Sequence, residues 1–445
     1  MTEMKTNTLF PLAAVALAAT LPSMGFAQEA SDEAALHTSY ILTTLLFLVG
    51  GFLVFWMAAG FAMLEAGLVR SKNVTMQLTK NISLFAIAAI MYWLIGFNIM
   101  YPGEWLIEGW LGPFFSITVL EPVGVAPADT ALDYASVGSD FFFQLMFCAT
   151  TASIVSGTLA ERIKLWPFLI FVVVLTGFIY PIEASWQWGG GWLSEAGFSD
   201  FAGSTLVHAA GGFAALAGAI VLGPRLGKYS SDGKINPMPG SNLALATLGT
   251  FILWLGWFGF NGGSQLAMGT VGDVADVSRI FANTNMAAAA GAIAALILTH
   301  VMFGKTDLTM VLNGALAGLV SITAEPLTPE LWEALVIGAI GGVIVVLTVP
   351  MLDRMKIDDV VGAIPVHLIA GLWGTFIVAW TNDGTSFVTQ IMGMASIGAF
   401  VFVFSLIVFF ILKATIGLRA SEEDEIAGLD ISELGMEAYP EFSKG

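Results

Sequence analysis

Two of the four histidines stand in the same local sequence pattern. His208 and His367 each fit D-x2-G-x4-H-x3-G, in residues 200–212 and 359–371, and each is preceded by valine. A neutral imidazole has one donor and one acceptor nitrogen, so it can take up a proton on one side and release one on the other. Two histidines in matching positions therefore predict a paired site that lines a pore or relays protons.

The composition indicates a membrane protein. Of the 445 residues, 57% are hydrophobic and 11% are charged, with a mean hydropathy of +0.82, which excludes a soluble enzyme. The net charge of -18 comes from acidic residues between apolar segments and near the C-terminus, and it does not support nucleic-acid binding. The single cysteine, Cys148, rules out an intramolecular disulfide and a cysteine-rich metal site. We expect no enzymatic activity, cofactor or metal.

Eleven apolar stretches are long enough to be candidate transmembrane helices. The segment at 308–323 is short and contains glycine, so it is the weakest of them. The expected fold is an all-α polytopic membrane protein of eleven spans, near residues 40–65, 76–100, 141–160, 165–184, 201–223, 241–262, 280–302, 308–323, 332–350, 360–380 and 391–417.

The N-terminus has the features of a secretory signal peptide. One lysine, Lys5, precedes a short apolar core that ends in small residues, and cleavage is expected after Ala27. The alternative is an uncleaved first span, but the core is short and contains Pro22. The expected parts are a signal peptide (1–27), a membrane domain (28–417) and a C-terminal tail (418–445).

Loop charges predict the orientation, because Lys and Arg concentrate on the cytoplasmic side of spans. With the N-terminus outside, the outer loops are acidic and contain Arg279 as their only cation. The C-terminus is then cytoplasmic. The inner connections contain Arg70, Lys72, Lys80, Arg162, Lys164, Arg225, Lys228, Lys234, Lys305, Arg354 and Lys356. Lys413 and Arg419 follow at the end of the last span.

The two histidine patterns fall on the fifth and tenth spans, which cross in opposite directions. This predicts an inverted repeat of spans 1–5 and 6–10 followed by a last helix, with the functional site near the midplane. Eight residues of helix rise about 12 Å, so each histidine lies that far inward from its aspartate, Asp200 outside and Asp359 inside. His37 and His300 lack the pattern, and we interpret both as incidental.

Aromatic and hydroxyl side chains near these patterns could hold a small cation. Trp188 precedes three glycines, and Ser264 ends the run WFGFNGGS at 257–264. An aromatic face attracts a cation by about 0.5–2 kcal/mol, and a hydroxyl can accept its hydrogen bond. On spacing alone, Trp188 is better interpreted as an interfacial residue, and Phe147 and Phe260 as packing residues.

Several motifs together resemble the Amt/Rh ammonium transporter family, in particular its bacterial Amt branch. They are the paired histidines, DFAGSTLVH (200–208), TLAERIK (158–164), WFGFNGGS (257–264) and GLRASEEDEIAGLD (417–430). The likeness extends from about residue 39 to residue 440 and reverses the interpretation of the aromatic residues. It implies that Trp188 and Ser264, with Phe147, bind ammonium at the outer face, and that Phe147 and Phe260 are a stacked pair closing the pore.

The resemblance also assigns the histidines and the first aspartate. His208 and His367 would line an apolar conduction path, and Asp200 would act structurally and electrostatically behind the recruitment site. The chain departs from the family at Gly362, where several members have a further Asp, and at Pro365, which tends to kink a helix. The inner vestibule is therefore expected to differ in detail.

A mechanism follows from desolvation. An ammonium ion loses its hydration in an apolar pore, whereas ammonia loses much less, so ammonium is expected to give up its proton near the outer phenylalanines. Potassium has no proton to release and is excluded. The family implies a homotrimer in the bacterial cytoplasmic membrane, methylammonium as a second substrate, and a PII-type signalling partner for the tail. Two alternatives stay open: an ammonium sensor that signals through the tail, and a neutral-gas channel of the Rh type.

Overall fold

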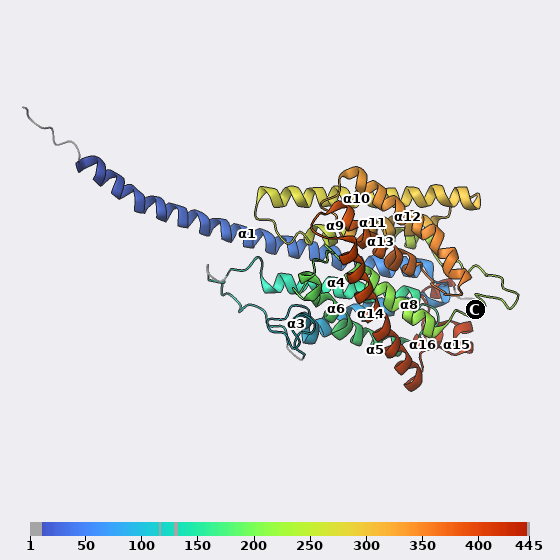
Figure 1. Cartoon of the computed structure of the whole chain (residues 1–445). Coiled ribbons are helices and arrows are strands. Elements are labelled where there is room, and N and C mark those ends of the chain that lie inside the picture. Colours follow the sequence, from blue (N-terminus) through green and yellow to red (C-terminus); the bar gives the residue numbers. More distant parts are fainter. Residues whose placement is uncertain (1–10, 115–116, 129–131, 443–445) are drawn as a thin grey trace, which may run out of the picture.

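The computed structural model describes residues 11–114, 117–128 and 132–442, with side chains from Asp32 onward. Over these residues the regular secondary structure is helical, and the few β-bridges are isolated pairs outside any strand. The helices pack into one bundle from which the first part of α1 extends outward (Figure 1). The predicted all-α polytopic fold is confirmed.

Ten of the described helical segments are long and apolar enough to cross a membrane, and the helix at 308–323 is shorter. Several segments join an α-helix to a π-helical turn, labelled η like the 3-10 helices. The elements are α1 (Pro11–Leu68), η1 (Ser71–Asn73), α2 (Val74–Met91), η2 (Tyr92–Gly96), α3 (Phe97–Met100), α4 (Val137–Thr158), α5 (Leu165–Val174), η4 (Leu175–Ile179), α6 (Tyr180–Ser185), α7 (Trp192–Glu195), η5 (Ser204–Ala209), α8 (Ala210–Leu222), α9 (Leu243–Gly263), α10 (Val271–Phe303), α11 (Leu308–Thr323), α12 (Leu331–Arg354), η6 (Ile364–Ile369), α13 (Ala370–Thr381), α14 (Phe387–Thr415), α15 (Glu422–Ala427), α16 (Leu429–Leu434) and η7 (Pro440–Phe442).

The predicted signal peptide falls partly on residues 1–10, which lie outside the described residues. From Pro11 the backbone is helical through Pro22 to Leu68, so the helix is not interrupted at that proline. Cleavage after Ala27 and the position of the termini relative to the membrane stay predictions.

Some predicted loop cations lie in helices, among them Arg279 in α10 and Arg354 at the end of α12. Lys80 was expected in a cytoplasmic connection, but it lies in α2 and is 1% exposed. A single lysine in an apolar sequence marks a loop only if nothing neutralises it inside the protein. Here α1 and α4 supply the partners, as described below.

Small residues allow α1 and α9 to approach closely. A Cβ on Gly249 would overlap the backbone of Leu64, and one on Gly67 would overlap the backbone of Ala246. In lipid, such close approach replaces the hydrophobic driving force that operates in water. These are the first helices of the two predicted halves, and they pack directly on each other.

Candidate functional site

Asp200 caps the helical turn that contains the first histidine. Its Oδ1 accepts hydrogen bonds from the backbone N–H groups of Gly203 and Ser204, at 3.1 and 2.8 Å. Its Oδ2 accepts from Thr205 and Leu206, at 2.8 and 2.9 Å. The first N–H groups of a helix have no partner within it, so one buried carboxylate satisfies four donors at the start of η5.

Asp359 does the same for the second histidine. Its Oδ2 accepts from the N–H of Ile364 at 2.7 Å, and its Oδ1 from the N–H of Gly362 at 3.2 Å. The hydroxyl of Thr158 adds a third donor at 3.0 Å. The aspartate of the repeated pattern is therefore the cap of the π-helical turn that carries the histidine.

The first glycine of each pattern allows the chain to turn into that cap. Gly203 has a φ of +101° and Gly362 a φ of +80°, a region that L side chains rarely adopt. Pro365 lies in the first turn of η6, where its missing N–H costs no helical bond.

The second glycine of each pattern allows the two halves to meet. A Cβ on Gly371 would lie 2.5 Å from the carbonyl oxygen of Ser204, and one on Gly212 would lie 2.8 Å from the backbone nitrogen of Leu368. Both contacts are closer than a real Cβ tolerates. The histidine turn of each half therefore packs against a glycine of the other half.

The two capped turns start near opposite ends of α11. Phe201 donates its N–H to the carbonyl of Ala324, just past the last residue of α11, at 2.8 Å. Asn313, in the first half of α11, donates its side-chain amide to the carbonyl of Val361 at 2.9 Å. This arrangement agrees with the inverted repeat predicted from the sequence.

The two histidines face each other where the turns meet. Nδ1 of His208 lies 3.1 Å from Nδ1 of His367, so one ring donates a proton and the other accepts it. Both residues are buried, and the ring of His208 stacks on Trp257 at 4.9 Å between centroids. The indole N–H of Trp257 donates to the hydroxyl of Thr323 at 2.8 Å, which fixes the stacking surface. Sequence analysis left Trp257 unassigned, although it begins the WFGFNGGS motif.

Two phenylalanines cover His208. The rings of Phe147 and Phe260 lie 4.1 Å apart between centroids, and Phe260 lies 5.2 Å from the ring of His208. Both phenylalanines are almost completely buried. The two phenylalanine rings therefore cover His208 on one side.

The two predicted recruitment residues each contact one member of this pair. Trp188 is half-buried and meets Phe147 edge to face, with the centroids 5.9 Å apart. Ser264 donates its hydroxyl to the carbonyl of Phe260 at 2.8 Å, so the lone pairs of its oxygen can accept a hydrogen bond. The indole N–H of Trp188 donates to the carbonyl of Asp200 at 3.0 Å, which fixes the ring.

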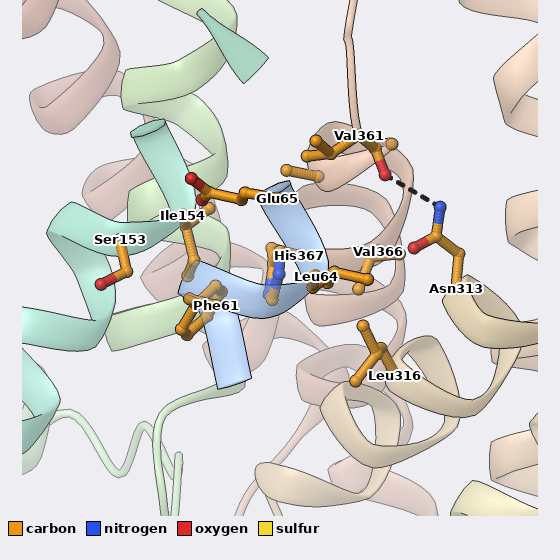
Figure 2. A pocket seen from close by; sticks show the side chains of 12 residues that line it. Phe61, Leu64, Glu65, Ser153, Ile154, Asn313, Leu316, Val361, Val366 and His367 are labelled. Carbon is orange, nitrogen blue, oxygen red and sulfur yellow. Dashed lines mark hydrogen bonds between the residues drawn. The ribbon is translucent and has the colours of Figure 1, made fainter. Parts of the chain in front are cut away.

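Beyond the histidines lies a cavity of about 10 Å³, enough for one molecule the size of water. His367, Phe61 and Glu65 contribute to its wall (Figure 2). Val361 and Gly362 line this cavity and also a larger one of about 590 Å³. The arrangement is thus a column. It consists of the two phenylalanine rings, the histidine pair, a small cavity and a wide vestibule.

All seven residues predicted from the sequence belong to this column or cap it. They are Trp188, Ser264, Phe147, Phe260, His208, His367 and Asp200. In the described part of the chain, no group of three or more His, Cys, Asp or Glu side chains is arranged to hold a metal ion. The polar chemistry of the column is therefore that of imidazole, hydroxyl and carboxylate groups.

The comparison with known proteins decides the family. The Ammonium Transporter Family profile matches residues 45–439. The chain belongs to the ammonium transporter family. It is 43% identical to ammonium transporter Amt2 of Archaeoglobus fulgidus, over 89% of this chain and 87% of that protein. Among solved structures, a sensor Amt protein is similar with a TM-score of 0.81 and 34% identity, covering 89% of this chain and 99% of that one. Candida albicans Mep2 has a TM-score of 0.77 and 25% identity, covering 92% of both chains.

The residues after α14 are polar, as predicted for the tail, but several of them are buried against the rest of the protein. Glu425 is 2% exposed; it accepts from the N–H of Leu226 at 2.8 Å and pairs with Arg419 at 2.7 Å. Asp430 accepts from the N–H groups of Thr75 and Met76 at the start of α2, at 3.0 and 2.7 Å. The tail of this ammonium transporter family member is folded against the ends of its spans.

A buried ionic network next to the tail was missed by sequence analysis. Arg225 binds both carboxylate oxygens of Asp358, at 2.8 and 2.9 Å, and Arg162 donates to the carbonyl of Asp358 at 2.7 Å. Burial raises the pKa of Asp358, but the hydrogen bonds from Arg225 and both guanidinium charges outweigh burial and lower it well below its ordinary value. The TLAERIK motif, which contains Arg162, was the available signal.

Proposed function

We propose that this protein transports ammonium across a bacterial cytoplasmic membrane. The observation that carries the proposal is the buried histidine pair behind two closely packed phenylalanine rings. A pair of imidazoles 3.1 Å apart can hand over a proton, and the closed aromatic layer keeps hydrated ions out. The names of the relatives, which are ammonium transporters, support the same substrate.

Recruitment would occur at Trp188 and Ser264. The ring of Trp188 is fixed by Phe147 and by the carbonyl of Asp200, so its face is presented without a further loss of side-chain entropy on binding. Ser264 supplies an acceptor for one N–H of ammonium. Asp200 adds negative charge on the same side without touching the ion.

Passage would then separate the proton from ammonia. The Phe147 and Phe260 rings would have to part for any molecule to reach His208, and an apolar opening favours neutral ammonia over the ion. The proton would move from His208 to His367 through the Nδ1 contact, while ammonia follows the apolar wall. Potassium has no proton to release, so it would be excluded.

The remaining features of the proposal concern the cell. The membrane domain would lie with its N-terminus outside after removal of the signal peptide, and the tail would be cytoplasmic. A homotrimer with one pore in each subunit, and a PII-type protein binding at the tail, are implied by the family. The folded tail offers a defined surface for such a partner.

A second candidate function is ammonium sensing. The observation that favours it is the tail, which contacts α2 through Asp430 and the loop after α8 through Glu425, so a movement of the spans would reach it. The likeness to a sensor Amt protein points the same way. Transport stays the main proposal, because the histidine column is complete.

The deciding experiment is ammonium-evoked current in proteoliposomes that contain only this protein. We expect a saturable current with ammonium and none with potassium. Ammonia permeation without current would favour a neutral-gas channel. Binding without any flux would favour a sensor.

A further inference from the structure

Glu65 is a buried carboxylate next to the histidine pair that the mechanism above does not use. It lies in α1 four residues after Phe61, whose ring centroid is 6.1 Å from that of His367. Four residues of α-helix rise about 6 Å, so Glu65 lies one turn beyond the level of Phe61. Its side chain, 1% exposed, lines the small cavity together with His367 (Figure 2).

The carboxylate is held by side-chain donors from two other helices. Its Oε2 accepts from Asn81 Nδ2 at 2.7 Å, from Ser156 Oγ at 3.0 Å and from Gln77 Nε2. Hydrogen bonds of this kind hold the anion in place without neutralising it. The position of the carboxylate beside the cavity is therefore fixed.

A lysine shares the same partners. Lys80 Nζ donates to Gln77 Oε1 at 3.1 Å and to the carbonyl of Ser156 at 2.8 Å, and it lies 4.6 Å from the centroid of the Phe168 ring. Gln77 and Ser156 thus each contact both charged groups. Glu65 and Lys80 form a bridged acid and base pair inside the bundle.

A purely structural pair would not need to reach a cavity. Ionisable groups within a membrane domain are costly and usually face a pathway. This cavity lies between His367 and the vestibule, it has room for one water-sized molecule, and Glu65 forms part of its wall. A molecule leaving the histidines therefore meets Glu65 next.

We propose that Glu65 is the inner proton-exchange residue, which returns a proton to ammonia as it leaves the histidine pair. The Glu65 carboxyl loses its O–H proton, ammonia gains an N–H bond, and the products are a carboxylate and ammonium. The carboxylate is recharged by the proton that crossed the two histidines, through one water in the cavity. Lys80 from α2 stabilises the carboxylate between these steps, and His367 from η6 lines the same cavity as Glu65. This proposal rests on the proposed transport function.

The test uses proteoliposomes in which the ammonium-evoked current and the internal pH are both measured, since ammonia that enters without its proton raises the internal pH. Glu65→Gln keeps the amide oxygen as an acceptor for the three donors but cannot exchange a proton. We expect it to lower the ammonium-evoked current by about a hundredfold or more, as for the loss of a positioned proton donor, while ammonia that enters without its proton raises the internal pH more than in wild type. Glu65→Asp keeps a carboxyl group and should retain a measurable current.

Two further variants separate chemistry from folding. Glu65→Gln with Lys80→Met removes both buried charges together, and it should reproduce the single variant. Glu325→Gln is the matched control, because Glu325 is also buried but lies past the other end of α11, and it should leave the current unchanged.

The other outcomes overturn the assignment. Wild-type current in Glu65→Gln would show that the carboxyl does not exchange the proton. Loss of current with no rise in internal pH, or failure of the double variant to fold, would show a structural role. An absence of current in the wild-type protein is a different result, which would overturn the proposed function itself and the role of Glu65 with it.

Discussion

Trp188 donates its indole N–H to the backbone carbonyl of Asp200, at 3.0 Å. The residue expected to bind the cation is therefore positioned by the residue that caps the histidine turn. A substitution of Trp188 or Asp200 should therefore affect both the outer site and the histidine pair. The first two predictions separate these effects.

Replacing Trp188 with Leu should weaken binding without opening the core, because the ring is half-buried. The loss of one cation–π contact of about 1 kcal/mol corresponds to a roughly fivefold higher half-saturating concentration. Methylammonium uptake as a function of concentration measures it. Trp166→Leu is the control, since this tryptophan is 69% exposed on α5. An unchanged concentration dependence in Trp188→Leu would remove this residue from the site.

Replacing Asp200 should destabilise the protein in graded steps. Asn keeps one acceptor oxygen and leaves two of the four N–H donors unsatisfied, whereas Ala leaves all four, at about 1–3 kcal/mol for each orphaned group. Thermal unfolding in detergent should rank wild type above Asn and Asn above Ala. Asp383→Asn, at an exposed loop position, should match wild type. Equal stability of all four proteins would contradict the capping role.

Replacing His208 and His367 together with Leu should leave the protein folded but abolish selective, proton-linked current. Both rings are buried among aromatic side chains, so apolar replacements fit the surroundings. Current with ammonium and with potassium is the measurement. A single replacement is a weaker test, because the remaining imidazole or a water can substitute. Wild-type current and selectivity in the double variant would refute the relay.

Deleting residues 418–445 should alter transport activity or its control by a soluble partner, while the membrane domain still inserts. The tail supplies acceptors to backbone N–H groups of Leu226, Thr75 and Met76, which the deletion exposes. A finer test is Glu425→Gln, which removes the charge paired with Arg419. The exposed Glu422→Gln is its control. Identical transport and regulation in the deletion and the full-length protein would leave the tail without a functional role.

Features that depend on local chemistry could be predicted from the sequence. Apolar runs of span length predict helices in any membrane protein, because backbone groups in lipid must bond within their own segment. The repeated pattern D-x2-G-x4-H-x3-G is also local: the aspartate caps its own turn and the first glycine supplies the positive φ. The roles of Trp188 and Ser264, in contrast, came from resemblance, because spacing alone favoured an interfacial tryptophan.

Only the tertiary structure decided which distant residues meet. The second glycine of each pattern, at 212 and 371, acts on the opposite half of the chain, which no spacing reveals. Glu65 and Lys80 become partners because α1, α2 and α4 pack together and Ser156 comes between them. From the sequence, a lone lysine is predicted to lie in a loop, because an unpaired charge in lipid is too costly. The cost is offset by neighbours such as Ser156, which lies 76 residues from Lys80 in the chain, and packing alone brings them together.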